Sequence, residues 1–394
     1  MIKRKNKNKN NPFYDPTLSK RHRSSKRFKR FTLASLLFSI AFLAFFLFDI
    51  IGKGSPAFEQ AYVNVEVTYN EASMKSYRKA IDRKYNNIVS RAWLRTLPME
   101  MKKNPELMGT KVKMWVLADD QVDQYLKGHY YKLKRKDRVL IDDMKETGDV
   151  ELKFNKIFFL NGDSKTPEFA GLNSAIIGSI LTLIITMLVA FPIGVMTAVY
   201  LEEFADDNKF TQTIEVNINN LAAIPSILFG LLGLAIFINL FGMPRSSPLV
   251  GGLTLALMTL PIIIVSSRAA LRAVPDSIRQ AAYGLGLTKI EVTRDHVLPL
   301  AFPGILTGSI IGLAQAMGET APLIIIGMIA FIPDSPESIF QAATVMPAQL
   351  FTWAGMPERM YIEKTAAGIM VLLTILISLN ALAIYLRKKY EVKW

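Results

Sequence analysis

Residues 172–200 read LNSAIIGSILTLIITMLVAFPIGVMTAVY, and this stretch decides the fold class. It contains no charged residue, and a helix of about 20 apolar residues crosses the roughly 30 Å apolar core of a bilayer. Five further stretches are predominantly apolar: 31–51, 217–241, 249–271, 302–332 and 365–386. We therefore predict an all-α polytopic membrane protein with six transmembrane helices and both termini on the same side.

The first apolar stretch, 31–51, has two interpretations. Ser55 and Ala57, just after it, resemble the small-x-small site at which a signal peptide is cleaved. The apolar run is longer than the roughly 7–15 residues of a signal-peptide core, so we favour an uncleaved membrane helix. Either interpretation leaves the next segment, 52–170, outside the cytoplasm.

The charge of the chain is concentrated at its ends. The 394 residues are 51% hydrophobic, yet the net charge is +14. Residues 1–30 hold 12 Lys and Arg residues and one acidic residue, and the tail 387–394 is also basic. Clustered cations can bind nucleic acid by neutralising its phosphates. Here the basic arm ends directly at a membrane helix, so we interpret both ends as cytoplasmic segments that contact lipid headgroups and bind no nucleic acid.

The composition excludes several kinds of catalytic site. The chain has no Cys, which removes disulfides, thiolate metal ligands and Cys nucleophiles. Its three His residues are too scattered for a zinc site, and no G-x-x-x-x-G-K-[ST] phosphate-binding loop occurs. We expect no catalytic residue, no metal, no cofactor and no ATP hydrolysis by this chain.

Residues 52–170 form a polar insertion between the first and second apolar stretches. Val63, Val65, Val67 and Tyr69 alternate with polar residues, a pattern typical of a half-buried strand. The stretches TKVKMWVLA (110–118) and DVELKFNKIFFL (149–160) look similar, whereas 73–97 has helical spacing. We predict a small extracytoplasmic α+β domain of about 120 residues, without a catalytic site.

Residues 275–305 read PDSIRQAAYGLGLTKIEVTRDHVLPLAFPGI, and their first part, 275–299, is a charged loop between two apolar stretches. The loop resembles the EAA loop of ABC importer permeases, whose short coupling helix docks in a cleft of the ATPase subunit. The resemblance implies that role for five positions: Gln280, Ala281, Ala282, Gly286 and Pro299. Small alanines allow close approach, Gly286 allows a sharp bend and Pro299 ends the loop. Gln280 departs from the usual Glu of the family, and His296 stands where an aliphatic residue is common.

The stretch 302–332 carries one acidic residue at membrane depth, Glu319. On a continuous helix, Gly304, Gly308, Gly312, Gln315 and Glu319 would share an arc of about 80°. The glycines would let another helix pack closely. A carboxylate inside a membrane is costly, so Glu319 should point into the protein or into a water-filled path. A buried, protonated Glu bonded to a neighbouring helix is the structural alternative.

The hexapeptide GETAPL, 318–323, resembles the signature of phosphate ABC transporter permeases of the PstA type. The resemblance extends over nearly all of 172–386. It includes YLEEFA at 200–205, NNLAAIPSILFGLLGL at 219–234 and LPIIIVSSRAALRAVP at 260–275. Members of this family have the type I ABC importer permease fold, so the resemblance implies such a domain over 171–386, in a bacterial inner membrane.

The same resemblance implies partners and path residues. The partners would be a second, PstC-like permease, a PstB-like ATPase dimer and a periplasmic, PstS-like phosphate-binding protein. Glu319, Gln315, Thr320 and Gly318 would line the phosphate path. Many phosphate permeases have an Arg where this chain has Gln315, so either Glu319 is protonated or a cation from elsewhere compensates. Arg268 or the partner permease could supply that cation, although Arg268 is also explained as an anchor at the membrane surface.

Two other functions fit part of these observations. A permease for another oxyanion, such as sulfate or molybdate, would share the coupling loop but usually lacks GETAPL. A membrane sensor or scaffold that displays 52–170 would not need a docking loop. Pro225 and Pro322 are compatible with helices broken along a substrate path, or with membrane prolines that are simply tolerated.

Overall fold

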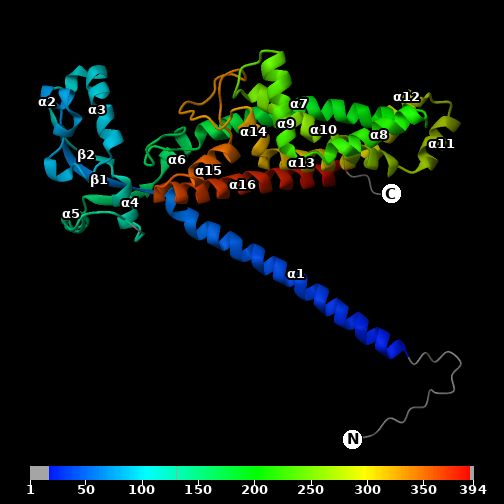
Figure 1. Cartoon of the computed structure of the whole chain (residues 1–394), viewed down its shortest axis with the longest axis horizontal. Coiled ribbons are helices and arrows are strands. Elements are labelled where there is room, and N and C mark those ends of the chain that lie inside the picture. Colours follow the sequence, from blue (N-terminus) through cyan, green and yellow to red (C-terminus); the bar gives the residue numbers. More distant parts are fainter. Residues whose placement is uncertain (1–16, 130, 391–394) are drawn as a thin grey trace, which may run out of the picture. The chain divides into compact units, whose positions relative to one another are not determined.

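The structure is a computed structural model that describes residues 17–129 and 131–390 (Figure 1). Residues 1–16 of the predicted basic arm and 391–394 of the predicted tail lie outside the described residues. The chain divides into two compact units, Met1–Gly52 and Lys53–Trp394.

Within the first unit, the described residues belong to helix α1, Leu18–Gly54, which ends just beyond the boundary. This helix is long and apolar enough to cross a membrane and covers the predicted first span. Basic residues occupy its first turns and the apolar run follows them without a break. The helix therefore continues from the charged segment into the apolar one.

In the described part of the chain, five helices are long and apolar enough to cross a membrane. They include α1 and four helices of the second unit: α7 (Asn173–Val199), α10 (Pro248–Arg272), α13 (Leu298–Gly318) and α16 (Arg359–Tyr390). A sixth span is counted only if the bent pair α8 (Lys209–Ala222) and α9 (Ser226–Gly233) is taken as one.

The predicted span 217–241 is not one straight helix, because the chain bends by 102° between α8 and α9. Pro225 lies at the break with an extended backbone, φ −55° and ψ 131°. Proline has no N–H to continue a helix and disfavours a helical residue before it, so Ile224 and Pro225 interrupt the helix. After Gly233 the chain continues as a π-helical segment, Leu234–Leu240.

Helix α10 is the central helix of the membrane part and packs against both α7 and α13. Glycines allow the close approach. A Cβ on Gly252 would lie 2.6 Å from Cβ of Ile185, and one on Gly194 would lie 2.7 Å from Cγ2 of Ile263. Because two larger residues would collide at these crossings, the glycines set the spacing between α7 and α10.

The insertion contains a three-stranded antiparallel sheet with the strand order β2-β1-β3. The strands are β1 (Glu59–Thr68), β2 (Lys111–Leu117) and β3 (Val150–Phe154). Val63, Val65 and Val67 of β1 are at most 1% exposed, as their alternation predicted. The helices of the insertion are α2 (Glu71–Lys75), α3 (Arg91–Lys103), α4 (Asp120–Leu126), α5 (Arg135–Glu146) and α6 (Lys156–Leu160).

Two predictions within the insertion need correction. The stretch 149–160 is not one strand, because β3 ends at Phe154 and the Asn155 side chain caps α6 by accepting a hydrogen bond from the Phe158 N–H. The stretch 73–97 is not one helix either, because Ser76 and Asp82 interrupt it with extended backbone and a long regular helix begins only at Arg91.

Charged side chains attach the insertion to α16. Lys127 pairs with Asp123 at 2.6 Å and with Glu363 of α16 at 3.5 Å, and His129 Nδ1 lies 2.7 Å from the Glu363 carboxylate. Lys364, which is 1% exposed, donates to the carbonyls of Pro167 and Ala170. The segment that leads into α7 is therefore held at the start of the last helix.

Candidate functional site

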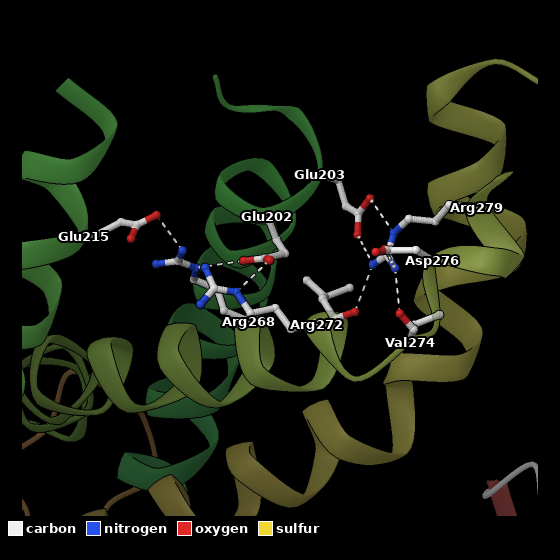
Figure 2. Close-up of polar contacts among 9 residues, drawn as sticks. Glu202, Glu203, Glu215, Arg268, Arg272, Val274, Asp276 and Arg279 are labelled. Atoms are coloured by element: carbon white, nitrogen blue, oxygen red, sulfur yellow. Dashed lines mark hydrogen bonds and ion pairs between the residues drawn. The ribbon is translucent and has the colours of Figure 1, made fainter. Parts of the chain in front are cut away.

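The loop after α10 is fixed to the end of α7 by a buried ion pair between Arg279 and Glu203 (Figure 2). Arg279 lies on α11 (Asp276–Gly284), and Glu203 lies in the π-helical turn Tyr200–Phe204 that extends α7. Arg279 Nη2 is 2.7 Å from Glu203 Oε1, and Nε is 3.4 Å from Oε2. The two side chains are 15% and 5% exposed. This hydrogen bonding raises the pKa of Arg279 above its usual range, so the guanidinium stays positively charged.

The same guanidinium also terminates α10. Arg279 Nη1 donates to the carbonyl of Val274 at 2.7 Å, and Nη2 donates to that of Leu271 at 2.9 Å. The Leu271 carbonyl lies in the last turn of α10, where it also accepts from the Val274 N–H at 3.2 Å, and the Val274 carbonyl lies just after the helix. At a helix end the carbonyls lack their helical donors, and the guanidinium supplies donors here. One side chain thus joins α7, α10 and α11, as Figure 2 shows.

A second set of ion pairs lies beside the first. Glu202 accepts from Arg272 at 2.7 Å and from Arg268 at 3.3 Å, and Arg268 also pairs with Glu215 of α8 at 2.5 Å. The Arg268 side chain is 12% exposed. Arg268 therefore bridges α7 and α8, and both of its carboxylate partners lie in this cluster.

The outer face of the loop is apolar and exposed. Leu285, Ile290 and Tyr283 are 81%, 64% and 43% exposed. The inner face packs on the ends of the membrane helices through Ala282, Val292 and their neighbours. A surface with this much apolar area, held on a rigid base, is typical of a protein-binding site.

The predicted coupling residues divide between these two faces. Ala282 is buried, whereas Gln280, Ala281 and Gly286 are exposed. Gly286 has φ +83°, a conformation that L residues rarely adopt, and it makes the turn after α11. Pro299 lies in the first turn of α13, inside a helical stretch that runs from Lys289 to Gly318 and so does not end at this proline.

The three predicted packing glycines of α13 face α10. A Cβ on Gly304 would lie 2.7 Å from Cβ of Ala270, and one on Gly308 would lie 2.1 Å from Oγ of Ser266. At Gly312 the closest atoms are those of Ile262 and Ile263, at 3.7 Å. The contact is therefore tight toward the loop end of α13 and looser beyond it.

Glu319 lies after α13 and not within it, which corrects the predicted continuous helix 302–332. The helix ends at Gly318, and Glu319 has an extended backbone, φ −75° and ψ 126°. Pro322 has no N–H to donate to the Gly318 carbonyl four residues earlier, and the chain resumes as the short helix α14, Ala321–Ile325. Glu319 therefore does not share a helix face with the glycines.

The predicted path residues surround this helix end. Gln315 and Gly318 are exposed, whereas Glu319 and Thr320 are half-buried. Across residues 17–129 and 131–390, no side chain forms a hydrogen bond or ion pair with the Glu319 carboxylate. Arg268, the candidate cation within the chain, pairs with Glu202 and Glu215.

Comparison with protein families now identifies the chain. A family model described as "Binding-protein-dependent transport system inner membrane component" matches residues 190–392. The chain belongs to this family. A second model, described as "Domain of unknown function (DUF3333)", matches residues 15–98 and 72–135. The first match covers the part of the membrane domain that contains the ion pairs of Arg279 and Arg268. The second match covers most of the insertion.

Several similar proteins are phosphate permeases. The phosphate transport system permease protein PstA of Yersinia pestis is 30% identical over 222 residues, which cover 56% of this chain and 74% of that protein. The PstA of Mycobacterium leprae is 36% identical over 160 residues, 40% of this chain and 52% of that protein. A probable ABC transporter permease, YqgI of Bacillus subtilis, is 29% identical over 239 residues, 57% of this chain and 81% of that protein. The chain is therefore a PstA-like ABC importer permease, a multi-pass protein of the inner membrane.

Sequence reasoning about this PstA-like permease missed the residues that hold the loop in place. Glu203 and Arg279 lie 76 residues apart, and no local pattern links them. The adjacent Glu202 and Glu203 at the end of an apolar span nevertheless indicate an ion-pair site, because carboxylates there need cationic partners. Leu285 and Ile290, which are apolar and exposed in a charged loop, are a second signal.

Proposed function

We propose that the chain is a permease subunit of an ATP-driven importer of inorganic phosphate and forms half of the translocation path. The GETAPL hexapeptide at 318–323 and the similarity to PstA proteins support phosphate as the substrate. The observation that carries the coupling role is the exposed apolar face of the 275–299 loop, held on a rigid base by Arg279. An exposed apolar surface on a loop that is fixed to the membrane helices is suited to binding an ATPase subunit.

Coupling would follow from the way the loop is attached. The apolar contacts of Leu285 and Ile290 with an ATPase would shift the loop when ATP closes the ATPase dimer. Because Arg279 bonds to Glu203 and to the end of α10, the shift would be transmitted to α7 and α10 together. The tight contact of Gly304 and Gly308 with α10 would pass it on to α13. The helices would then rock between inward-open and outward-open states.

The path would run past the end of α13, where Glu319, Gln315, Thr320 and Gly318 meet. Broken helices in transporters place backbone and polar side chains next to a substrate. A charged Glu319 alone repels phosphate, so either it is protonated and donates a hydrogen bond, or the second permease subunit supplies a cation. The engagement of Arg268 with two carboxylates favours a source other than Arg268.

The proposed assembly contains this chain, a second PstC-like permease, a PstB-like ATPase dimer and a periplasmic PstS-like phosphate-binding protein. The basic arm and tail support a topology with both termini in the cytoplasm, on which the insertion 52–170 would lie in the periplasm. On this topology the loop 275–299 faces the ATPase. The whole arrangement has six membrane spans, with α8 and α9 as the bent one.

Uptake of labelled phosphate into vesicles that contain the complete complex tests the proposal. With ATP inside, we expect uptake by the native complex and at least a tenfold loss in Glu319→Gln, with the subunits still co-purifying. Glu337→Gln is the matched control, because Glu337 is an exposed Glu in the loop after α14. Normal uptake kinetics in Glu319→Gln would remove Glu319 from the path. Equal competition by sulfate, molybdate and phosphate would refute phosphate selectivity, and uptake without ATP would refute an ATP-driven importer.

A further inference from the structure

Three carboxylates converge in the insertion, away from the coupling loop and the path. Asp119 and Asp120 begin α4, and Glu168 lies in the segment between α6 and α7. One carboxylate oxygen from each lies within 4.8 Å of the other two. Segments 48 residues or more apart in sequence therefore bring three acids to one point.

Glu168 is the side chain that requires a ligand. It is 5% exposed, and its Oε2 is buried without a hydrogen-bond partner among the described residues. The Glu168 backbone carbonyl is held by the Gln60 side chain at 2.7 Å, which fixes the residue so that its carboxylate faces the two aspartates. A buried carboxylate oxygen with no donor is costly unless something outside the chain pairs with it.

Two buried ammonium groups of this region bond to other atoms. Lys364 donates to the carbonyls of Pro167 and Ala170, and Lys127 pairs with Asp123 and Glu363. Throughout the described ranges, which omit 1–16, 130 and 391–394, no Lys or Arg lies within ion-pair distance of the three carboxylates. The negative charge at this point is therefore not neutralised by a direct ion pair.

We propose that Asp119, Asp120 and Glu168 bind a calcium ion. All three offer oxygen ligands, which Ca²⁺ prefers, and together they can supply up to about six of the six to eight oxygens that it takes. Two ligands of one ion lie at most two metal–oxygen distances apart, about 4.6–5.2 Å for Ca²⁺ and about 4.0–4.2 Å for Mg²⁺. Separations of 4.8 Å or less allow the three oxygens to bind one Ca²⁺ ion with little rearrangement.

The bound ion would have a structural effect. Asp119 and Asp120 are half-buried, so an ion can enter from solvent, whereas Glu168 closes the inner side. The ion would join the start of α4 to the segment that leads into α7. It would thereby add to the attachment of the insertion to the membrane helices that Lys364 and Glu363 already provide.

A shared proton is the rival occupant. Burial and the neighbouring Asp120 carboxylate raise the pKa of Asp119 to about 8, so at neutral pH a proton can relieve part of the repulsion without any metal. Adding calcium distinguishes the two occupants. If protons alone occupy the site, added calcium should neither bind nor raise the thermal unfolding midpoint.

The experiment uses the full chain, purified in detergent, treated with a chelator and then titrated with CaCl₂. Binding of radioactive calcium and the thermal unfolding midpoint are both measured. We expect one ion per chain, bound in the ~0.1–1 mM range typical of extracytoplasmic sites, and a midpoint that rises by about 2–5 °C at saturation. Glu168→Gln should bind calcium at least tenfold more weakly. In chelator it should be as stable as the native chain or more so, because one buried charge is gone.

Glu151→Gln is the matched control, because Glu151 is an exposed carboxylate of the same domain that pairs with Lys153 at 3.3 Å. It should bind calcium like the native chain. Asp119→Asn provides a second test if Glu168→Gln does not fold. The proposal is overturned if the native chain neither binds calcium nor gains stability, if Glu151→Gln loses as much binding as Glu168→Gln, or if Mg²⁺ stabilises the chain as well as Ca²⁺ does.

Discussion

Replacing Arg279 with Ala should uncouple the 275–299 loop from the membrane helices. Arg279 makes two hydrogen bonds to Glu203 and one each to the carbonyls of Leu271 and Val274. In Arg279→Ala the Glu203 side chain, which is 5% exposed, loses its cationic partner. A buried carboxylate without such a partner is costly.

The expected loss of stability comes mainly from the stranded carboxylate. Removing one partner of a buried ion pair costs about 3–5 kcal/mol. Arg279 retains 15% exposure, so water reaches part of the pair and the lower end, about 3 kcal/mol, is the better value. At about 1–2 °C per kcal/mol for a chain of this length, the unfolding midpoint should fall by about 3–6 °C.

The assay is thermal unfolding of the purified chain, followed by recovery of the ATPase with the permease complex. Arg294→Ala is the control, because Arg294 lies in the same loop, is 68% exposed and pairs only with its neighbour Asp295 among the described residues. It should unfold like the native chain. Combining Glu203→Gln with Arg279→Ala should recover about half of the lost stability, because no buried charge is then stranded. If Arg279→Ala is no less stable than Arg294→Ala, or if Glu203→Gln gives no recovery, the pair does not hold the loop.

Two further predictions concern the other contacts. Gly308→Ala should destabilise the chain by about 1–3 kcal/mol and so lower its unfolding midpoint, because the new Cβ would lie 2.1 Å from Ser266 Oγ and overpack this contact. Gly284→Ala should leave the midpoint unchanged, because no atom lies within 4 Å of its new Cβ. Equal midpoints for the two variants would contradict the close contact between α13 and α10. In a chain without native Cys, Leu285→Cys should react quickly with a maleimide when the permease is alone and at least tenfold more slowly when the ATPase is bound. Unchanged labelling would place the ATPase elsewhere.

Most of the helices could be predicted from the sequence because apolar length alone indicates a membrane helix. The stretches 172–200 and 249–271 match α7 and α10 closely, since nothing interrupts their helices before the polar ends. Pro192 and Pro261 lie inside these helices without breaking them. Pro225, in contrast, produces a bend of 102°. Neighbouring helices decide whether a membrane proline is accommodated, and a single sequence does not reveal those neighbours.

The contacts that form the sites could not be predicted, because they join distant segments. The Arg279–Glu203 pair and the meeting of Glu168 with Asp119 depend on how the helices and the insertion fold back on themselves. The sequence does show that these residues are charged and that they lie at the end of an apolar span or next to a strand. Which charge meets which is a property of the tertiary structure alone.

The break at Gly318 separates two roles that a continuous helix would have combined. On such a helix, Gly308 and Glu319 would face the same neighbour, and any change in packing would move the carboxylate with it. In the structure, Gly308 contacts α10 through Ser266, whereas Glu319 follows the helix on extended backbone. We therefore expect packing substitutions at Gly308 to act on stability and coupling, and Glu319→Gln to act on uptake with little effect on stability. The proposed contact of Glu319 with substrate is therefore separate from the packing contact between α13 and α10.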